Sequence, residues 1–141
     1  MRILFLGDVV GNSGCLKIKN NLLDQIRKQK IDFVVVNAEN ADASGVGLTK
    51  EICEDFFSCG INVITTGNHV WDQKDIMKYI DKEYRLLRPK NLIEPAPGKG
   101  FEIYTAQNKK RVGVLNLMGN VFMKKCDNVF EISKKFIKDY E

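Results

Sequence analysis

Apolar residues recur along the chain with two different spacings. Continuous runs of apolar and β-branched residues at 2–6, 31–36 and 61–65 are typical of strands that are buried on both faces. Between these runs, apolar residues stand three or four positions apart, which predicts helices over 15–28, between Thr49 and Gly60, and after Asp72. The alternation predicts an α/β domain with a mostly parallel sheet, flanked by helices and built from right-handed crossovers.

Polar residues at the predicted helix starts refine the boundaries. Thr49 is expected to cap the second helix, and Gly60 is expected to end it. Asp72 is expected to cap the third helix, and Asp75 would place a negative charge in its first turn.

The pattern changes from residue 86 onwards. Proline and glycine recur between residues 88 and 100 and predict a long loop. Apolar segments at 101–105 and 111–116, separated by polar residues 107–110, predict a β-hairpin. Residues 128–140 carry apolar side chains at helical spacing, so they are expected to form an amphipathic helix that packs against another element.

Composition narrows the class of protein. Of 141 residues, 44% are hydrophobic and 28% are charged, as in an ordinary soluble globular domain. The net charge is only +4 and the basic residues are scattered, so the sequence carries no strong nucleic-acid signal. No segment approaches the roughly 18 consecutive apolar residues of a membrane span. The first apolar run is interrupted at Asp8, too early for a signal peptide.

The cysteines indicate the compartment. There are four, none of them in a C-x-x-C pair, which favours reduced thiols over a disulfide framework or a zinc cluster. We therefore expect a cytoplasmic protein.

Side chains able to bind metal or transfer protons follow three consecutive predicted strands. They are Asp8, then Glu39 and Asn40, then Asn68 and His69, and His69 is the only histidine in the chain. Parallel strands end at one edge of a sheet, where ligands bind in open α/β folds, so these residues are expected to converge. Carboxylate and amide oxygens suit hard cations, and imidazole suits iron, manganese or zinc. Taken singly, each has a simpler interpretation: a helix cap for Asp8, an ordinary loop for Glu39 and Asn40, a turn for Asn68 and a surface position for His69.

Three motifs carry a family resemblance. Gly7-Asp8-Val9-Val10-Gly11, Asn37-Ala38-Glu39-Asn40 and Thr66-Gly67-Asn68-His69-Val70-Trp71-Asp72 resemble the calcineurin-like metallophosphoesterases. More narrowly, the chain is similar to the bacterial YmdB-type subgroup, which is associated with 2′,3′-cyclic nucleotide phosphodiesterase activity. The resemblance covers essentially the whole chain. It implies an αββα sandwich, of which this chain would form the N-terminal half.

The resemblance also implies a mechanism. Asp8 and Asn40 would hold a first metal ion, Glu39 would bridge, and Asn68 would hold the second. Two divalent or mixed-valence ions, iron or manganese, would activate a hydroxide that attacks phosphorus in line. His69 would give a proton to the leaving oxygen. The expected substrates are phosphodiesters, in particular 2′,3′-cyclic nucleotides.

The chain departs from the family pattern in its histidines. Family members continue for about as many residues again and carry further histidines on later strands, whereas this chain has none after His69. Residues 1–141 are thus expected to be a single truncated domain that binds metal poorly and lacks activity without a complementing C-terminal polypeptide. The face that the absent strands would cover should be apolar, and homo-oligomers are a second expected form of association.

Two alternatives remain open. The turn from Gly7 to Gly14 precedes a predicted helix, so it could cradle phosphate in a nucleotide-binding module. However, its spacing is G-x-x-x-G-x-x-G, and Asp8 would repel phosphate unless a cation intervened. The other alternative is a non-catalytic remnant that acts only through association.

Overall fold

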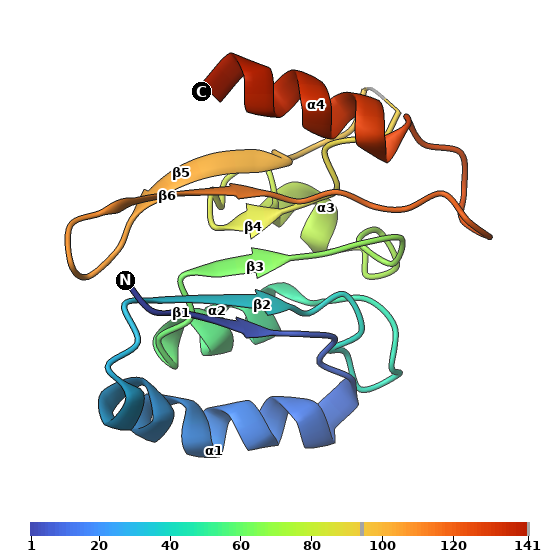
Figure 1. Cartoon of the computed structure of the whole chain (residues 1–141). Coiled ribbons are helices and arrows are strands. Elements are labelled where there is room, and N and C mark those ends of the chain that lie inside the picture. Colours follow the sequence, from blue (N-terminus) through green and yellow to red (C-terminus); the bar gives the residue numbers. More distant parts are fainter. Residues whose placement is uncertain (94, 141) are drawn as a thin grey trace.

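A four-stranded parallel sheet forms the centre of the protein. The computed structural model describes residues 1–93 and 95–140. The strands β1 (Ile3–Leu6), β2 (Phe33–Asn37), β3 (Val63–Thr65) and β4 (Leu86–Leu87) lie in that order across the sheet, and all of their carboxyl ends reach the same edge (Figure 1). The helices α1 (Gly11–Gln29), α2 (Lys50–Ser58) and α3 (Ile76–Tyr79) cover one face. The predicted α/β class with a parallel sheet is confirmed.

A β-hairpin covers the other face of the sheet. It consists of β5 (Phe101–Thr105) and β6 (Arg111–Leu115), which pair antiparallel as predicted. Helix α4 (Val129–Tyr140) lies on the outer side of the hairpin, where the ring of Phe101 is 4.6 Å from that of Phe136 and 4.9 Å from that of Tyr140. The layers therefore follow the order helix, sheet, sheet, helix (Figure 1).

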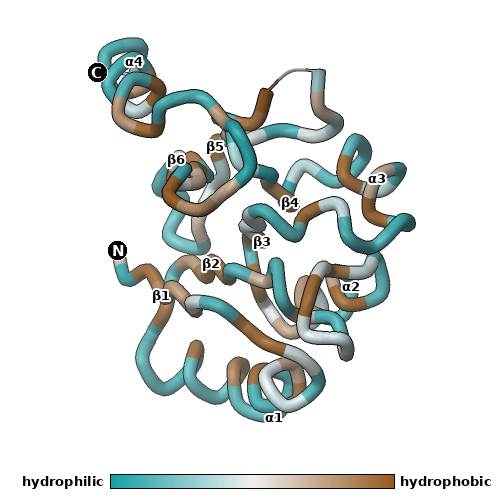
Figure 2. Tube along the Cα trace, turned by 90° about the vertical axis from the view of Figure 1, so that its right-hand side faces the viewer, coloured by the Kyte–Doolittle hydropathy of each residue, from teal (hydrophilic) through white to brown (hydrophobic). Residues whose placement is uncertain are grey.

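Two apolar cores hold the first helical layer, the parallel sheet and the hairpin together. Alternate residues of β2 point to opposite faces: Val34 and Val36 pack toward the helices, and Phe33 and Val35 pack toward the hairpin. In Figure 2, β1 and β2 are coloured mainly hydrophobic, whereas hydrophilic colour dominates α1.

The outer face of β1 is left partly bare. The hairpin covers residues of β2, β3 and β4, and the side chains of Ile3 and Phe5 on β1 remain 49% and 61% exposed. β1 is also an edge strand of the sheet, so the prediction that the run at 2–6 is buried on both faces is wrong. Exposed apolar side chains on an edge strand are the usual mark of a surface that receives further polypeptide.

The structure corrects the predicted course of the chain in three places. α1 begins at Gly11, so half of the expected turn from Gly7 to Gly14 is helical. Leu86 and Leu87 form β4 by pairing with Ile64 and Thr65, although we expected the long loop to begin there; two residues are too few to show a period. Asp72 does not cap α3, whose N-cap is Asp75.

The helix cap predicted at Thr49 is confirmed. The Thr49 hydroxyl accepts a hydrogen bond from the backbone N–H of Ile52 at 3.3 Å. The carboxylate of Asp75 accepts a second bond from the N–H of Lys50 at 2.8 Å, so a residue before α3 completes the cap of α2.

The four cysteines are free thiols, and two of them are buried. Burial raises the pKa of Cys15 and Cys53, which keeps both thiols protonated and slow to react. We expect an aromatic disulfide reagent to label the less buried Cys59 and Cys126 at least about tenfold faster than the other two. Mass spectrometry of the labelled peptides measures the order, and equal rates at all four sites would contradict this packing.

Of the helices formed by residues 1–93 and 95–140, none combines the length and the apolar composition that crossing a membrane requires.

Candidate active site

The loops that follow β1 and β2 remain paired beyond the ends of the strands. The N–H of Val9 donates to the carbonyl of Asn37 at 3.0 Å, and the N–H of Gly11 donates to the carbonyl of Asn40 at 2.9 Å. This pairing places Asp8 beside Asn40, and the Asn40 amide nitrogen donates to Asp8 Oδ1 at 2.7 Å. Two of the predicted ligands are therefore in direct contact.

Asp8 adopts an unusual backbone conformation. Its φ angle is +44°, in the left-handed region that few residues other than glycine occupy. Its side chain does not cap α1, because the N-cap is Val10, which makes no side-chain cap hydrogen bond. The interpretation of Asp8 as a helix cap is thus wrong. Strained backbone of this kind is concentrated at functional sites.

The backbone pairing between Gly11 and Asn40 also tests the alternative that the turn from Gly7 to Gly14 cradles phosphate. Such a cradle needs free backbone N–H groups at the start of the helix. The N–H of Gly11, the first residue of α1, already donates to Asn40, and this weighs against that alternative.

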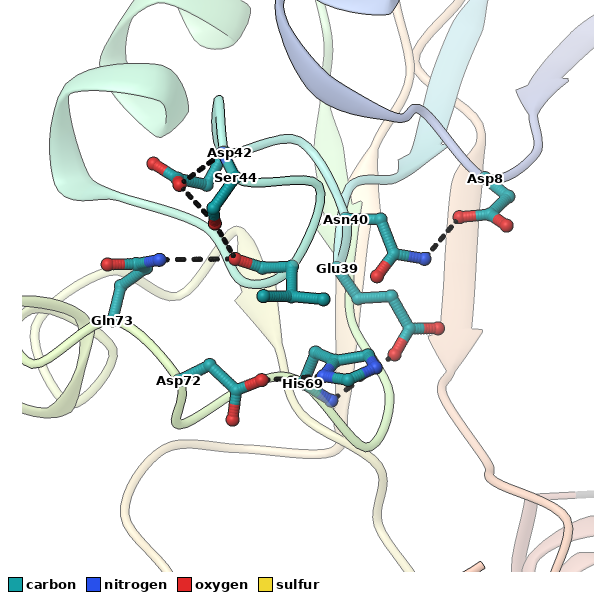
Figure 3. A network of polar contacts seen from close by, with 9 residues as sticks. Asp8, Glu39, Asn40, Asp42, Ser44, His69, Asp72 and Gln73 are labelled. Atoms are coloured by element: carbon teal, nitrogen blue, oxygen red, sulfur yellow. Dashed lines mark hydrogen bonds and ion pairs between the residues drawn. The ribbon is translucent and has the colours of Figure 1, made fainter. Parts of the chain in front are cut away.

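The Glu39 carboxylate lies at the centre of the cluster. Its Oε2 accepts a hydrogen bond from the backbone N–H of His69 at 3.4 Å. The carboxylate also rests directly against Gly67: a Cβ atom on Gly67 would lie 2.6 Å from Glu39 Cδ, closer than real Cβ atoms come. Figure 3 shows Glu39 between the Asp8–Asn40 pair and His69. Glycine is therefore required at position 67 to leave room for this carboxylate.

The side chain of His69 is paired with Asp72, which the sequence pattern had predicted to cap a helix. The Nδ1 atom of its ring lies 2.5 Å from Oδ2 of Asp72, and both side chains are partly exposed (Figure 3). A carboxylate only accepts hydrogen bonds, so Nδ1 carries the proton. The pair fixes the orientation of the imidazole and leaves Nε2 able to interact with a substrate. The spacing H-x-x-D within a turn was the signal that could have identified Asp72.

A neighbouring loop braces this arrangement. The Ser44 hydroxyl and N–H both donate to Asp42 Oδ1, at 2.6 and 2.9 Å, and these bonds hold the pKa of Asp42 below its usual value. The side chain of Gln73 donates to the carbonyl of Val46 at 3.1 Å, which ties residues 42–47 to the segment after Asp72 (Figure 3).

Asn68 lies at the same edge of the sheet. It follows Gly67 directly, and the two residues form part of the wall of an adjoining pocket. Contacts thus join Asp8 to Asn40, and Glu39 to Gly67 and His69, while Asn68 is placed nearby by its position in the chain.

The donor atoms suit a hard metal ion, but they are few. Asn40 uses its amide nitrogen toward Asp8, which leaves the amide oxygen, the atom that a metal takes. No three His, Cys, Asp or Glu side chains within residues 1–93 and 95–140 form a metal-binding group on their own. Any metal held here would depend on the two asparagines and on further ligands.

Comparison with known proteins gives a family. A family model described as YmdB-like protein matches residues 4–141. The chain is 43% identical over 130 residues to a 2′,3′-cyclic-nucleotide 2′-phosphodiesterase of Bacillus subtilis, covering 92% of this chain and 48% of that protein. It is 36% identical over 143 residues to a putative phosphatase/phosphodiesterase of Mycoplasma pneumoniae, covering 97% of this chain and 50% of that protein.

Solved structures agree with this family assignment. A hypothetical protein from Thermus thermophilus superposes with a TM-score of 0.89 at 29% identity, over 99% of this chain and 53% of the other. A protein described as a novel phosphatase, from Mycoplasma pneumoniae, superposes with a TM-score of 0.88 at 36% identity, over 99% and 51%. The chain spans about half the length of the curated relatives that it matches.

Proposed function

Because the chain belongs to the YmdB-like protein family, we propose that it supplies one half of the active site of a metal-dependent phosphodiesterase that acts on 2′,3′-cyclic nucleotides. The observation that carries this proposal is the contact cluster at the carboxyl edge of the sheet, where Asp8 meets Asn40 and Glu39 meets His69. The name of the Bacillus subtilis relative supports the choice of substrate.

In this proposal the oxygen donors hold two metal ions, iron or manganese. Asp8 and Asn40 would hold the first, Asn68 would hold the second, and Glu39 would be shared between them. When bound, such ions neutralise phosphate charge and make water nucleophilic near neutral pH. The contact between Glu39 and Gly67 supports a bridging role, because it fixes the carboxylate in the middle of the cluster.

His69 and Asp72 handle the proton. In the overall reaction, water adds to phosphorus, the bond from phosphorus to one ester oxygen breaks, and that oxygen needs a proton as it leaves. His69 supplies this proton from Nε2, since Nδ1 is engaged by Asp72. Asp72 is a positioning residue: it sets the direction of the ring and stabilises the protonated form that donates.

We further propose that polypeptide corresponding to the other half of the relatives completes the metal shells, as a continuation of this chain or as a separate one. Four ligands shared between two ions are too few for firm binding. The exposed Ile3 and Phe5 on edge strand β1 support docking of further structure on this side of the sheet. We call the two halves together the completed enzyme.

The test is to co-express this chain with the half of the Bacillus subtilis relative that it does not span, and to assay hydrolysis of 2′,3′-cyclic AMP with manganese. We expect hydrolysis that a chelator abolishes, and a loss of about 10² to 10⁴ in rate for His69→Ala. The chain without its complement should show little activity. Hydrolysis that survives chelation, or full activity in His69→Ala, would overturn the assigned roles. A co-purifying pair with no hydrolysis would overturn the function.

A further inference from the structure

A pocket of about 300 Å³ adjoins the predicted metal site. Gly67 and Asn68 form one part of its wall, Trp71 and Met77 another, and Lys124 and Lys125 lie at its margin. Gly67 also contacts the Glu39 carboxylate, so one short segment separates the pocket from the centre of the cluster. A ligand whose phosphate lay beside Asn68, with metal ions offsetting the charge of Glu39, could therefore extend directly into this space.

Building on the proposed function, we propose that this pocket receives the base of the nucleotide substrate while its phosphate lies at Asn68. The wall is mainly apolar and includes the flat indole of Trp71, and flat aromatic bases bind by stacking on such surfaces. The two lysines in the lining bring positive charge that favours an anionic ligand. The volume is at the lower end of the range for small-molecule sites, as suits a single base.

Buried side chains hold the pocket wall in place. The guanidinium of Arg88 is buried and donates to the carbonyls of Pro97 at 3.2 Å and Ala96 at 3.2 Å, which fixes the segment that closes one side. On the other side, the buried amide of Asn91 donates to the carbonyl of Met118 at 2.7 Å and accepts from its N–H at 2.9 Å. A preformed wall lowers the ordering cost of binding.

Trp71 is the only tryptophan in the chain, so its fluorescence reports on this pocket. We would titrate the chain, without metal and with a chelator present, with adenosine, 3′-AMP, ribose 5-phosphate and inorganic phosphate, correcting for absorption by the base. We expect a saturable change with adenosine and with 3′-AMP, because both carry the base, and none with the two ligands that lack one. An equal response to ribose 5-phosphate, or no response to either base-containing ligand, would overturn the proposal.

Two substitutions sharpen this titration. Ala96→Leu fills the pocket and should weaken 3′-AMP binding by about tenfold, whereas Asn20→Leu, on the exposed surface of α1, should leave it unchanged. Lys124→Ala with Lys125→Ala should weaken binding of 3′-AMP and leave that of adenosine unchanged, without perturbing packing, because both side chains are exposed. Unchanged binding in Ala96→Leu together with unchanged 3′-AMP binding in the lysine variant would overturn the proposal.

The result is independent of catalysis. Binding of 3′-AMP at Trp71 without hydrolysis by the completed enzyme would overturn the proposed function but keep the pocket. Hydrolysis of cyclic nucleotides by the completed enzyme, with no base-dependent change in fluorescence, would overturn the pocket but keep the proposed function. Loss of nucleotide binding on addition of the complementing half would show that polypeptide occupies the pocket, and would overturn the proposal.

Discussion

Replacing Gly67 with alanine is expected to lower phosphodiesterase activity of the completed enzyme by about 10²-fold while leaving the fold intact. The new Cβ would lie 2.6 Å from Glu39 Cδ, whereas ordinary contacts begin at 3.4 Å. The Glu39 side chain can swing away because its carboxylate is the far end of a flexible chain, so the backbone need not move. If Glu39 bridges metal ions as proposed, a displacement of its carboxylate by about 1 Å is enough for a loss of this size.

The matched control for this variant is Gly119→Ala. A Cβ atom at Gly119 meets nothing within 4 Å. Both variants should therefore melt within a few degrees of the unsubstituted protein by circular dichroism, but only Gly67→Ala should also weaken manganese binding, by about ten- to a hundredfold in equilibrium dialysis. Retention of both activity and metal affinity in Gly67→Ala would show that Glu39 does not act from the position seen here.

The sequence predicts the framework of this site because the framework follows from local rules. Apolar runs before Asp8, Glu39 and Asn68 define three strands, and the helical segments between them require parallel crossovers. Parallel crossovers in turn bring the carboxyl ends of the strands to one edge. The contacts between Asp8 and Asn40, and between Glu39 and the residues after β3, are the structural result.

Other features depend on partners that are distant in sequence and were missed. Leu86 and Leu87 become a strand only because β3 lies beside them, and no periodicity in two residues could show this. Glycine is needed at position 67 because of Glu39, which lies 28 positions earlier in the chain. This requirement becomes visible only when the two segments are packed together. The sequence gives no sign of the pocket beside Asn68 either, since its walls come from segments that are far apart in the chain.

Asp72 illustrates a different failure. An acidic residue shortly before apolar residues at helical spacing is a common helix cap, and this pattern led to the wrong role. In the structure Asp75 takes the N-cap position, its carboxylate serves α2 through Lys50, and Asp72 turns to His69. Local propensity thus identified a polar residue of importance but could not choose between a backbone partner and an imidazole.

Asp72→Asn is expected to lower the rate of 2′,3′-cyclic AMP hydrolysis by the completed enzyme by about 10²-fold, with little change in KM. Asparagine keeps the size of the side chain, but its amide nitrogen can donate to Nδ1 of His69. The ring then carries its proton on Nε2 in the neutral form, and the negative charge that stabilises the protonated ring is lost. Asp24→Asn, on the exposed surface of α1, is the matched control and should retain full activity.

Comparing substrates with different leaving groups distinguishes a role of His69 and Asp72 in proton transfer from a purely structural role. The alkoxide released from a cyclic nucleotide needs a proton, whereas p-nitrophenolate leaves readily without one. Asp72→Asn and His69→Ala should therefore slow cyclic AMP hydrolysis far more than hydrolysis of bis-p-nitrophenyl phosphate. A structural defect at the edge of the sheet would slow both reactions to the same extent. Equal losses on the two substrates would thus remove His69 and Asp72 from proton transfer, because the loss of a proton donor slows departure of the alkoxide more than that of p-nitrophenolate.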